Sequence, residues 1–241
     1  MHQTTKGILL RQIKYKENSY IVDFYTESFG LVSFIVNTSR NRKFVLQSVI
    51  PSPLSIMELC FYSRPGSNLH RIKEANIAYS FHSVTCHPIK MTMILFLQEV
   101  LYHALKREEV NPALYDYIES AILWLDGSAE HFVNFHLVFL MRLTRLLGFW
   151  PNVGSYQHGD VFDLLEGQFS SLTPMHQYFL ENSEALLLPM LTRMNFRNMR
   201  FFRMNRVQRR RFLDVLVLYY RLHVPEFPEL KSLNVLKEIL S

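Results

Sequence analysis

The sequence predicts an α+β protein, with a small five-stranded barrel in residues 1–81 and an all-helical domain in residues 88–241. Two observations lead to this prediction. Hydrophobic residues follow a strand-like pattern over the first 80 residues and change to a helical spacing after Pro88. The 241 residues are 49% hydrophobic and 20% charged, a composition that supports a sizeable core in one or two domains.

Five short runs in the first 80 residues are rich in β-branched and aromatic residues, and Gly, Asn, Ser or Pro separates them. They span residues 7–15, 19–26, 31–36, 55–62 and 69–79. From Tyr20 to Phe24 the second run alternates as a half-buried strand does, and a hairpin turn follows at residues 27–30. Because closure removes the unpaired edges of a small sheet, we expect a closed barrel; an SH3-like barrel would show the same pattern.

Helices are expected after the barrel. An amphipathic stripe over residues 91–105 predicts a helix that ends near Glu108. Asn111 and Pro112 are an N-cap and a first-turn proline for a second helix, which Gly127 would end.

The next segment is less regular. Ser128 is expected to cap a third helix that stops at Gly148. Residues 149–171 are expected to be irregular, and the Thr-Pro pair at residues 173–174 predicts the start of another helix.

Charge is distributed unevenly along a chain whose net charge is +5. Residues 1–82 hold ten Lys/Arg against five Asp/Glu, residues 83–191 hold five against twelve, and residues 192–241 hold eleven against four. Two basic ends flank an acidic middle. This distribution favours local capture of polyanions over a uniformly basic surface.

Basic and aromatic residues are interleaved in the barrel, which is the pattern that single-stranded nucleic acid requires: cations for the phosphates and rings on which bases stack. The candidate cations are Lys6, Arg11, Lys14, Lys16, Arg40, Arg42 and Lys43. Tyr15, Tyr20 and Phe44 lie near loops and are the stacking candidates, whereas Phe24 and Phe34 are expected in the core.

Residues 192–213 contain eight arginines and no acidic residue. Asn205, followed three residues later by Gln208, predicts a capping box at the start of a helix that runs through His223. Four of the arginines lie in the opening turns of that helix, where the helix dipole disfavours cations. We therefore expect an anion at this segment; the alternative is a solvated basic face.

Nothing in the sequence indicates an enzyme. No catalytic motif or phosphate-binding loop is present, and His131 and His136 are five residues apart, too far for one face of a helix. The two cysteines, Cys60 and Cys86, exclude a disulfide framework and indicate a reducing compartment. The chain shows no signal peptide, and its apolar stretch at residues 91–97 is far shorter than a membrane span, so we expect a soluble, cytoplasmic protein.

Four motifs, in order along the chain, resemble the bacterial RecO family of DNA repair proteins. They are T-x-G-I-L-L-R-x-x-x-Y-x-E at residues 5–17, T-E-x-x-G at 26–30, R-L-x-x-L-L-G-F-x-P at 142–151 and K-S-L-x-V-L-K-E at 231–238. The resemblance covers nearly the whole chain. It implies that the N-terminal barrel is an OB-fold nucleic-acid-binding domain and that the helical domain binds DNA and partners.

The resemblance also implies a function in DNA recombination. It predicts binding to single- and double-stranded DNA, annealing of complementary strands, and loading of RecA, together with RecR, onto DNA coated by single-stranded DNA-binding protein. The alternative is an adaptor that acts through its helical domain without contacting nucleic acid.

For the arginine-rich segment, the resemblance offers two anions: DNA phosphate and the acidic C-terminal tail of single-stranded DNA-binding protein. A tail that combines carboxylates with apolar end residues needs a cationic rim and an apolar pocket. We assign the rim to Arg200, Arg203 and Arg206, and the pocket to Met199, Phe202 and Met204, with DNA as a second ligand.

Many RecO sequences carry four cysteines after the Leu-Leu-Gly segment, and the resemblance alone would imply zinc there. Residues 153–171 of this chain contain no cysteine, so we expect neither zinc nor another cofactor. His158, Asp160, Asp163 and Glu166 lie in that stretch, but their spacing matches no standard metal loop.

Overall fold

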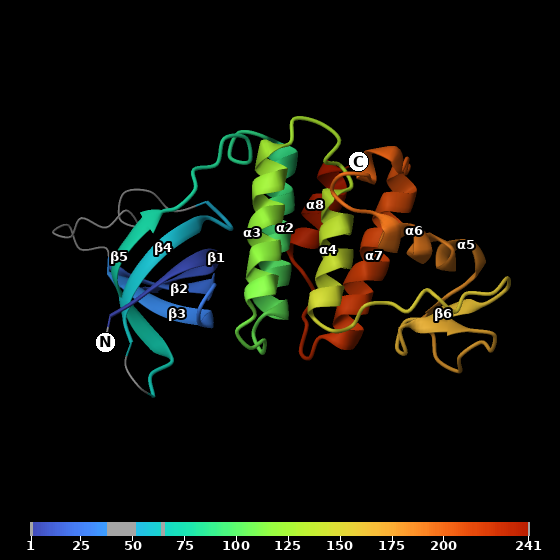
Figure 1. Cartoon of the computed structure of the whole chain (residues 1–241), viewed down its shortest axis with the longest axis horizontal. Coiled ribbons are helices and arrows are strands. Elements are labelled where there is room, and N and C mark those ends of the chain that lie inside the picture. The colour runs from blue at the N-terminus through green and yellow to red at the C-terminus, as the bar shows by residue number, and fades with distance from the viewer. Residues whose placement is uncertain (1, 38–51, 64–65, 241) are drawn as a thin grey trace. The chain divides into compact units, whose positions relative to one another are not determined.

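The computed structural model describes residues 2–37, 52–63 and 66–240 (Figure 1). The chain forms two compact units. The first unit contains Met1–Gly127 and Leu230–Ile239, and the second contains Ser128–Glu229 with the last two residues. The second unit is thus an insertion, because the chain leaves the first unit after Gly127 and returns to it at Leu230.

The first unit begins with five strands, drawn in blue to cyan in Figure 1. They are β1 (His2–Lys16), β2 (Ser19–Thr26), β3 (Gly30–Asn37), β4 (Ile56–Tyr62) and β5 (Leu69–Ile77). They close into a barrel in the order β1-β2-β3-β5-β4. β3 and β5 pair in parallel, and the other neighbours pair antiparallel. This Greek-key barrel is an OB-fold, so the predicted fold class is confirmed.

Alternate side chains along the strands point into the barrel and form its core. Phe24 and Phe34, both expected in the core, are completely buried, and their rings meet edge to face with centroids 6.0 Å apart. Gly7 leaves room for this core, because a Cβ atom there would lie 2.8 Å from the Leu59 side chain. The predicted hairpin turn is also present, and Gly30 adopts a φ of 65° where β3 begins.

Helices α2 (Pro88–Ala104), α3 (Pro112–Gly127) and α8 (Ser232–Ile239) complete the first unit. The expected helix starts at Pro88 and Pro112 are present, although α2 ends before the predicted Glu108. Gln98 of α2 donates a hydrogen bond to the backbone carbonyl of Leu9, which ties the helix to the barrel.

Asp126, near the end of α3, organises the connection between the barrel and the helices. Its buried carboxylate accepts hydrogen bonds from the backbone N–H groups of His82, Ser83 and Val84, and from the hydroxyl of Tyr79. Burial opposes ionisation, but these donors lower the pKa of Asp126 to about 2.

The second unit contains α4 (Phe135–Leu146), α5 (Asn182–Ala185), α6 (Leu187–Arg193), the short 3₁₀ helix η1 (Met199–Phe201) and α7 (Arg206–His223). The capping box at the start of α7 is confirmed, since Asn205 and Gln208 exchange side-chain to backbone hydrogen bonds. Tyr220 of α7 donates to the backbone carbonyl of Leu140 and so fixes α7 on α4.

Three expectations for this unit were wrong. α4 begins at Phe135 and not after Ser128, because His131 has a φ of 63° that interrupts a helix. No helix starts at residues 173–174; the next helix is α5. Part of the stretch expected to be irregular forms a small sheet of β6 (Val161–Asp163) and β7 (Gln168–Ser170), joined by β8 (Phe179–Leu180).

We expect Asp126→Ala to lower the free energy of unfolding by about 2–4 kcal/mol at pH 7, because buried N–H donors lose their acceptor. The folded-state pKa lies below the usual value, so this stabilisation is present above about pH 4 and decreases as the pH falls toward 2. Urea unfolding at pH 7 and pH 3 measures both effects. The exposed Asp116→Ala on the same helix is the control, and equal stability of the two variants at pH 7 would contradict the assignment.

Candidate nucleic-acid interface

The tip of the β1–β2 hairpin is a basic and aromatic surface in the described part of the barrel. Lys14, Tyr15 and Lys16 are exposed there, and the Tyr15 side chain is 52% accessible. Tyr20 is the strand partner of Lys14, and its ring packs partly against the barrel core. This loop joins the first two strands, one of the positions at which OB-folds bind oligonucleotides.

No described carboxylate neutralises the lysines at the hairpin tip. In the part of the chain that the structure describes, neither Lys14 nor Lys16 forms an ion pair with a carboxylate. The Lys16 ammonium lies 5.5 Å from the centre of the Tyr15 ring, a cation–π contact that holds the two side chains together. A cation and a flat ring therefore lie side by side at this tip.

The other two β1 candidates are engaged within the first unit. The Lys6 ammonium lies 3.3 Å from a carboxylate oxygen of Glu119 on α3. Arg11 donates to Asp23 over 2.6 Å, and its guanidinium lies 4.4 Å from the centre of the Tyr102 ring on α2. These contacts hold helices on the barrel, so Lys6 and Arg11 are less available to a phosphate than the hairpin lysines.

Four further candidates cannot be placed. Arg40, Arg42, Lys43 and Phe44 lie outside the described residues. Their role in binding nucleic acid remains a prediction from the sequence.

The arginine segment, residues 193–211, runs from the end of α6 to the first turns of α7 and lies along α4. Arg142 of α4 donates two hydrogen bonds, of 3.1 and 2.9 Å, to the backbone carbonyl of Met194. Near the start of α4, the Asn134 side chain donates to the Phe202 carbonyl and accepts from Arg209. The segment is therefore fixed at both ends of one helix.

Hydrogen bonds from backbone N–H groups to asparagine side chains shape the segment between these anchors. The Asn195 side chain accepts the N–H groups of Arg197 and Asn198, and the Asn198 side chain accepts the N–H of Asn195 over 2.7 Å. The Phe196 ring stacks on Phe135 of α4, with centroids 5.1 Å apart. These contacts keep the backbone in place while most arginine side chains of the segment are exposed.

Arg211 and Arg209 of the segment are engaged with neighbouring groups. Arg211 binds both carboxylate oxygens of Glu184, at 2.7 and 2.9 Å, and this pairing lowers the pKa of Glu184. Arg209 donates to the Asn134 side chain and the Met204 carbonyl, and its burial, together with nearby Arg206, lowers its pKa.

Five arginines of the segment are exposed and make no ion pair with any carboxylate in the described ranges. They are Arg193, Arg197, Arg200, Arg203 and Arg206. Such a group of like charges raises the local positive potential, which the N-terminal dipole of α7 increases further.

The apolar residues of the segment are not arranged as an open pocket of Met199, Phe202 and Met204. Met199 and Met204 are 1% and 9% accessible and belong to the core, and Phe202 is partly buried. Phe201 and Val207 are exposed instead, at 70% and 77%, and the Arg200 guanidinium lies 4.7 Å from the Phe201 ring. Sequence spacing did not identify these two residues, because the segment is too irregular for a single helical period.

His136 of α4 is a buried histidine and not a binding residue. It is completely buried, and neither ring nitrogen has a hydrogen-bond partner among the residues that the structure describes. Burial, with a smaller effect of Arg209, lowers its pKa to about 3. His136 is therefore neutral near pH 7.

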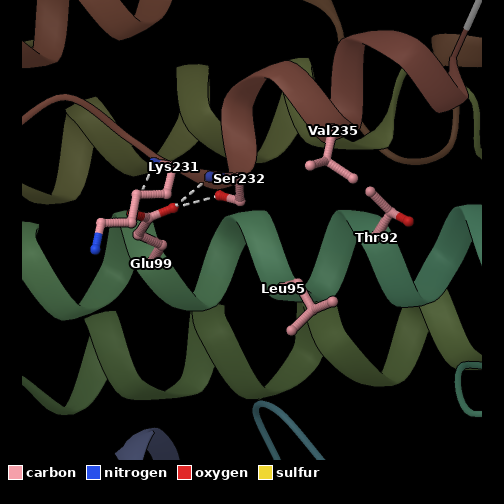
Figure 2. Close-up of a pocket in the computed structure, with 6 residues that line it drawn as sticks. All are labelled: Thr92, Leu95, Glu99, Lys231, Ser232 and Val235. Atoms are coloured by element: carbon pink, nitrogen blue, oxygen red, sulfur yellow. Dashed lines mark hydrogen bonds between the residues drawn. The ribbon is translucent and has the colours of Figure 1, made fainter.

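A groove of about 370 Å³ lies between α2 and α8 (Figure 2). The Glu99 carboxylate accepts the backbone N–H groups of Lys231 and Ser232, each over 2.9 Å, and the Ser232 hydroxyl. Burial opposes ionisation of Glu99, but these donors lower its pKa. Glu99 thus caps the last helix, and Leu95 and Val235 supply apolar lining. The groove brings together no set of catalytic groups.

Comparisons with known proteins match the chain in two consecutive parts. Residues 1–81 match the family model described as Recombination protein O N terminal, and residues 87–234 match Recombination protein O C terminal. The chain is 46% identical to the DNA repair protein RecO of Phocaeicola vulgatus over 241 residues, which is all of both chains. The chain belongs to the RecO family. RecO of Bacteroides fragilis is 46% identical over 240 residues, or 99% of each chain, and RecO of Porphyromonas gingivalis is 31% identical over 98% of each.

Membership of the RecO family places the chain in DNA repair and recombination. No described helix is both long and apolar enough to cross a membrane.

In this RecO chain, residues 153–171, which contain no cysteine, are stabilised by hydrogen-bonded turns and by aromatic packing. Asp163 accepts the N–H groups of Leu165 and Glu166 and lies 3.3 Å from His176, and Asp160 accepts the N–H of Gln157. The rings of Tyr156, Phe162 and Phe169 pack beside them. Among the described residues, no group of three or more His, Cys, Asp or Glu side chains could hold a metal ion.

Proposed function

We propose that this chain is a recombination mediator without catalytic activity. It binds single- and double-stranded DNA, anneals complementary strands and, with RecR, loads RecA onto DNA coated by single-stranded DNA-binding protein. The observation that carries this proposal is the set of exposed cations that no described carboxylate neutralises, at the hairpin tip of the OB-fold and along the arginine segment. RecR and RecA follow from family membership alone.

Annealing is compatible with such surfaces because it requires no covalent step. Two strands of DNA repel each other through their phosphates, and bound cations reduce this repulsion while releasing counterions. Tyr15 and Tyr20 offer rings on which separated bases can stack, which keeps them accessible to a second strand.

The arginine segment is also suited to the acidic tail of single-stranded DNA-binding protein. Arg200, Arg203 and Arg206 are exposed, and we assign the cationic rim to them. The apolar contact comes from the exposed Phe201 and Val207, since Met199 and Met204 are buried in the core. DNA is the second ligand of this surface.

An adaptor that does not contact nucleic acid is the second candidate function. The exposed Phe201 and Val207 favour it, because apolar side chains at such exposure are typical of protein-binding sites. The two functions differ in salt dependence: phosphate binding weakens steeply with salt, and binding through apolar anchors changes little.

We expect the double variant Lys14→Ala/Lys16→Ala to bind single-stranded DNA more weakly and with a smaller salt dependence. Loss of two phosphate contacts reduces the slope of log K against log salt by about 1.4 for a single strand. Fluorescence anisotropy of a labelled oligothymidine at several salt concentrations measures both quantities. Lys6→Ala is the matched control, because Lys6 already pairs with Glu119, and its slope is expected to stay at the wild-type value. Identical slopes in the double variant and the wild type would exclude the hairpin tip from the interface.

We expect Arg203→Glu to lower the affinity for an acidic tail peptide by at least about tenfold, because an attractive contact becomes repulsive. Isothermal titration of the peptide into the wild type and the variant measures this change. Arg221→Glu on α7 is the control, since Arg221 already lies 3.7 Å from Glu229. Equal peptide affinity in the wild type and Arg203→Glu would remove this surface from the tail-binding proposal.

A further inference from the structure

Trp150 lies just after α4, in the motif at residues 142–151, and the functions proposed above do not use it. Gly148, with a φ of 84°, ends the helix and reverses the chain. The N–H groups of Leu147 and Phe149 return to the carbonyls of Leu143 and Thr144, each over 3.0 Å. The turn therefore places Trp150 back against the last turn of α4.

Phe149 and Trp150 contact different helices. The Phe149 ring packs against Tyr219, Tyr220 and His223 of α7, and it lies parallel to the His223 ring at 5.3 Å. Trp150 instead contacts α4, where the guanidinium groups of Arg142 and Arg145 each lie 5.9 Å from its ring. Because Phe149 is anchored and Pro151 is buried, the backbone that carries the Trp150 ring is held on both sides.

The Trp150 ring is partly exposed and not tightly covered by these arginines. A distance of 5.9 Å is close to the limit of ~6 Å for a cation–π contact, and the Arg11 guanidinium lies much closer to Tyr102, at 4.4 Å. Arg145 is exposed and pairs with no carboxylate within the described ranges. The site thus combines a fixed flat ring with an unneutralised cation.

Trp150 is also next to the arginine segment. Arg142 contacts the Trp150 ring and donates to the carbonyl of Met194, the residue after Arg193. From this point the segment follows α4 to Asn134, eight residues away, which corresponds to about 12 Å of helix. The segment that carries the exposed arginines therefore runs from the vicinity of Trp150 along α4.

We propose that Trp150 stacks an unpaired base of single-stranded DNA, while Arg145 and Arg193 bind the flanking phosphates. An aromatic ring beside a line of cations is the arrangement by which single strands are bound without sequence preference. A paired base keeps its faces covered by its neighbours in the duplex, so this site selects single-stranded over double-stranded DNA. The proposal rests on the DNA-binding function proposed above and assigns it a contact in the second unit.

A single-tryptophan protein tests the proposal directly. The chain has two tryptophans, so Trp124→Phe leaves Trp150 as the only one. We expect oligothymidine to quench its fluorescence saturably, and an abasic oligomer of equal length to leave it unchanged while still binding. If anisotropy shows binding of oligothymidine and the fluorescence does not change, stacking is excluded and the DNA-binding function stands. If anisotropy shows no binding at all, the DNA-binding function itself fails.

Variants at the site give a second, independent measurement. We expect Trp150→Leu to lower the affinity for oligothymidine at least about fivefold, with a smaller loss in Trp150→Phe and no loss for duplex DNA. Arg145→Ala is expected to reduce the salt slope by about 0.7, and Arg221→Ala is its control because Arg221 lies beside Glu229. Thermal unfolding verifies that each variant is folded. Equal loss for single strands and duplex in Trp150→Leu would contradict stacking. Quenching by an acidic peptide, and not by oligothymidine, would assign the ring to a protein interface and overturn the proposal.

Discussion

Neutral acceptors hold the arginine segment in place, and the binding properties of the second unit depend on this arrangement. Arg142 binds the Met194 carbonyl, and Arg209 binds the Asn134 amide and the Met204 carbonyl. Hydrogen bonds to neutral groups satisfy a partly buried guanidinium without cancelling its charge. The backbone of the segment is therefore rigid while its positive potential remains available to a ligand.

The barrel uses its cations in two ways. Toward the helices, Lys6 and Arg11 meet Glu119 and Asp23, and Ser33 donates a further hydrogen bond of 2.6 Å to Asp23. At the hairpin tip Lys14 and Lys16 are exposed and pair with no described carboxylate, and Lys16 lies beside the Tyr15 ring. The same residue type thus contributes to packing at one end of β1 and to a basic surface at the other. The role of each cation depends on whether a carboxylate is within reach.

The sequence was sufficient to predict those helices and strands whose pattern is set by residues adjacent in the chain. The strand at Tyr20 to Phe24, the helix start at Pro112 and the capping box at Asn205 depend on neighbours in the chain, and the structure has each of them, although β2 is buried on both faces and not half-buried. The three-stranded sheet could not be predicted, because β6, β7 and β8 are two or three residues long and depend on pairing between them. Ser128 looked like a cap, but the turn at His131 moves the start of α4 to Phe135.

The candidate site was only partly visible in the sequence, for a related reason. Counting arginines located the basic segment, but periodicity could not show that Met199 points into the core while Phe201, two residues later, is exposed. That difference arises from the short η1 helix and from the anchors on α4, which connect residues about 50 to 70 positions apart. Trp150 was missed because the sequence could not show that Arg142, which lies beside its ring, also binds the carbonyl of Met194, 52 positions further along the chain.

The salt dependence of single-stranded DNA binding by the full chain tests most directly whether these cations bind phosphates. Anisotropy of a labelled oligothymidine, measured from about 50 to 300 mM salt, gives the slope of log K against log salt. We expect a slope of about −3 or steeper, which corresponds to four or more phosphate contacts at ~0.7 each. A slope shallower than about −1, or the absence of binding at the lowest salt, would contradict a phosphate-binding role for the hairpin tip and the arginine segment.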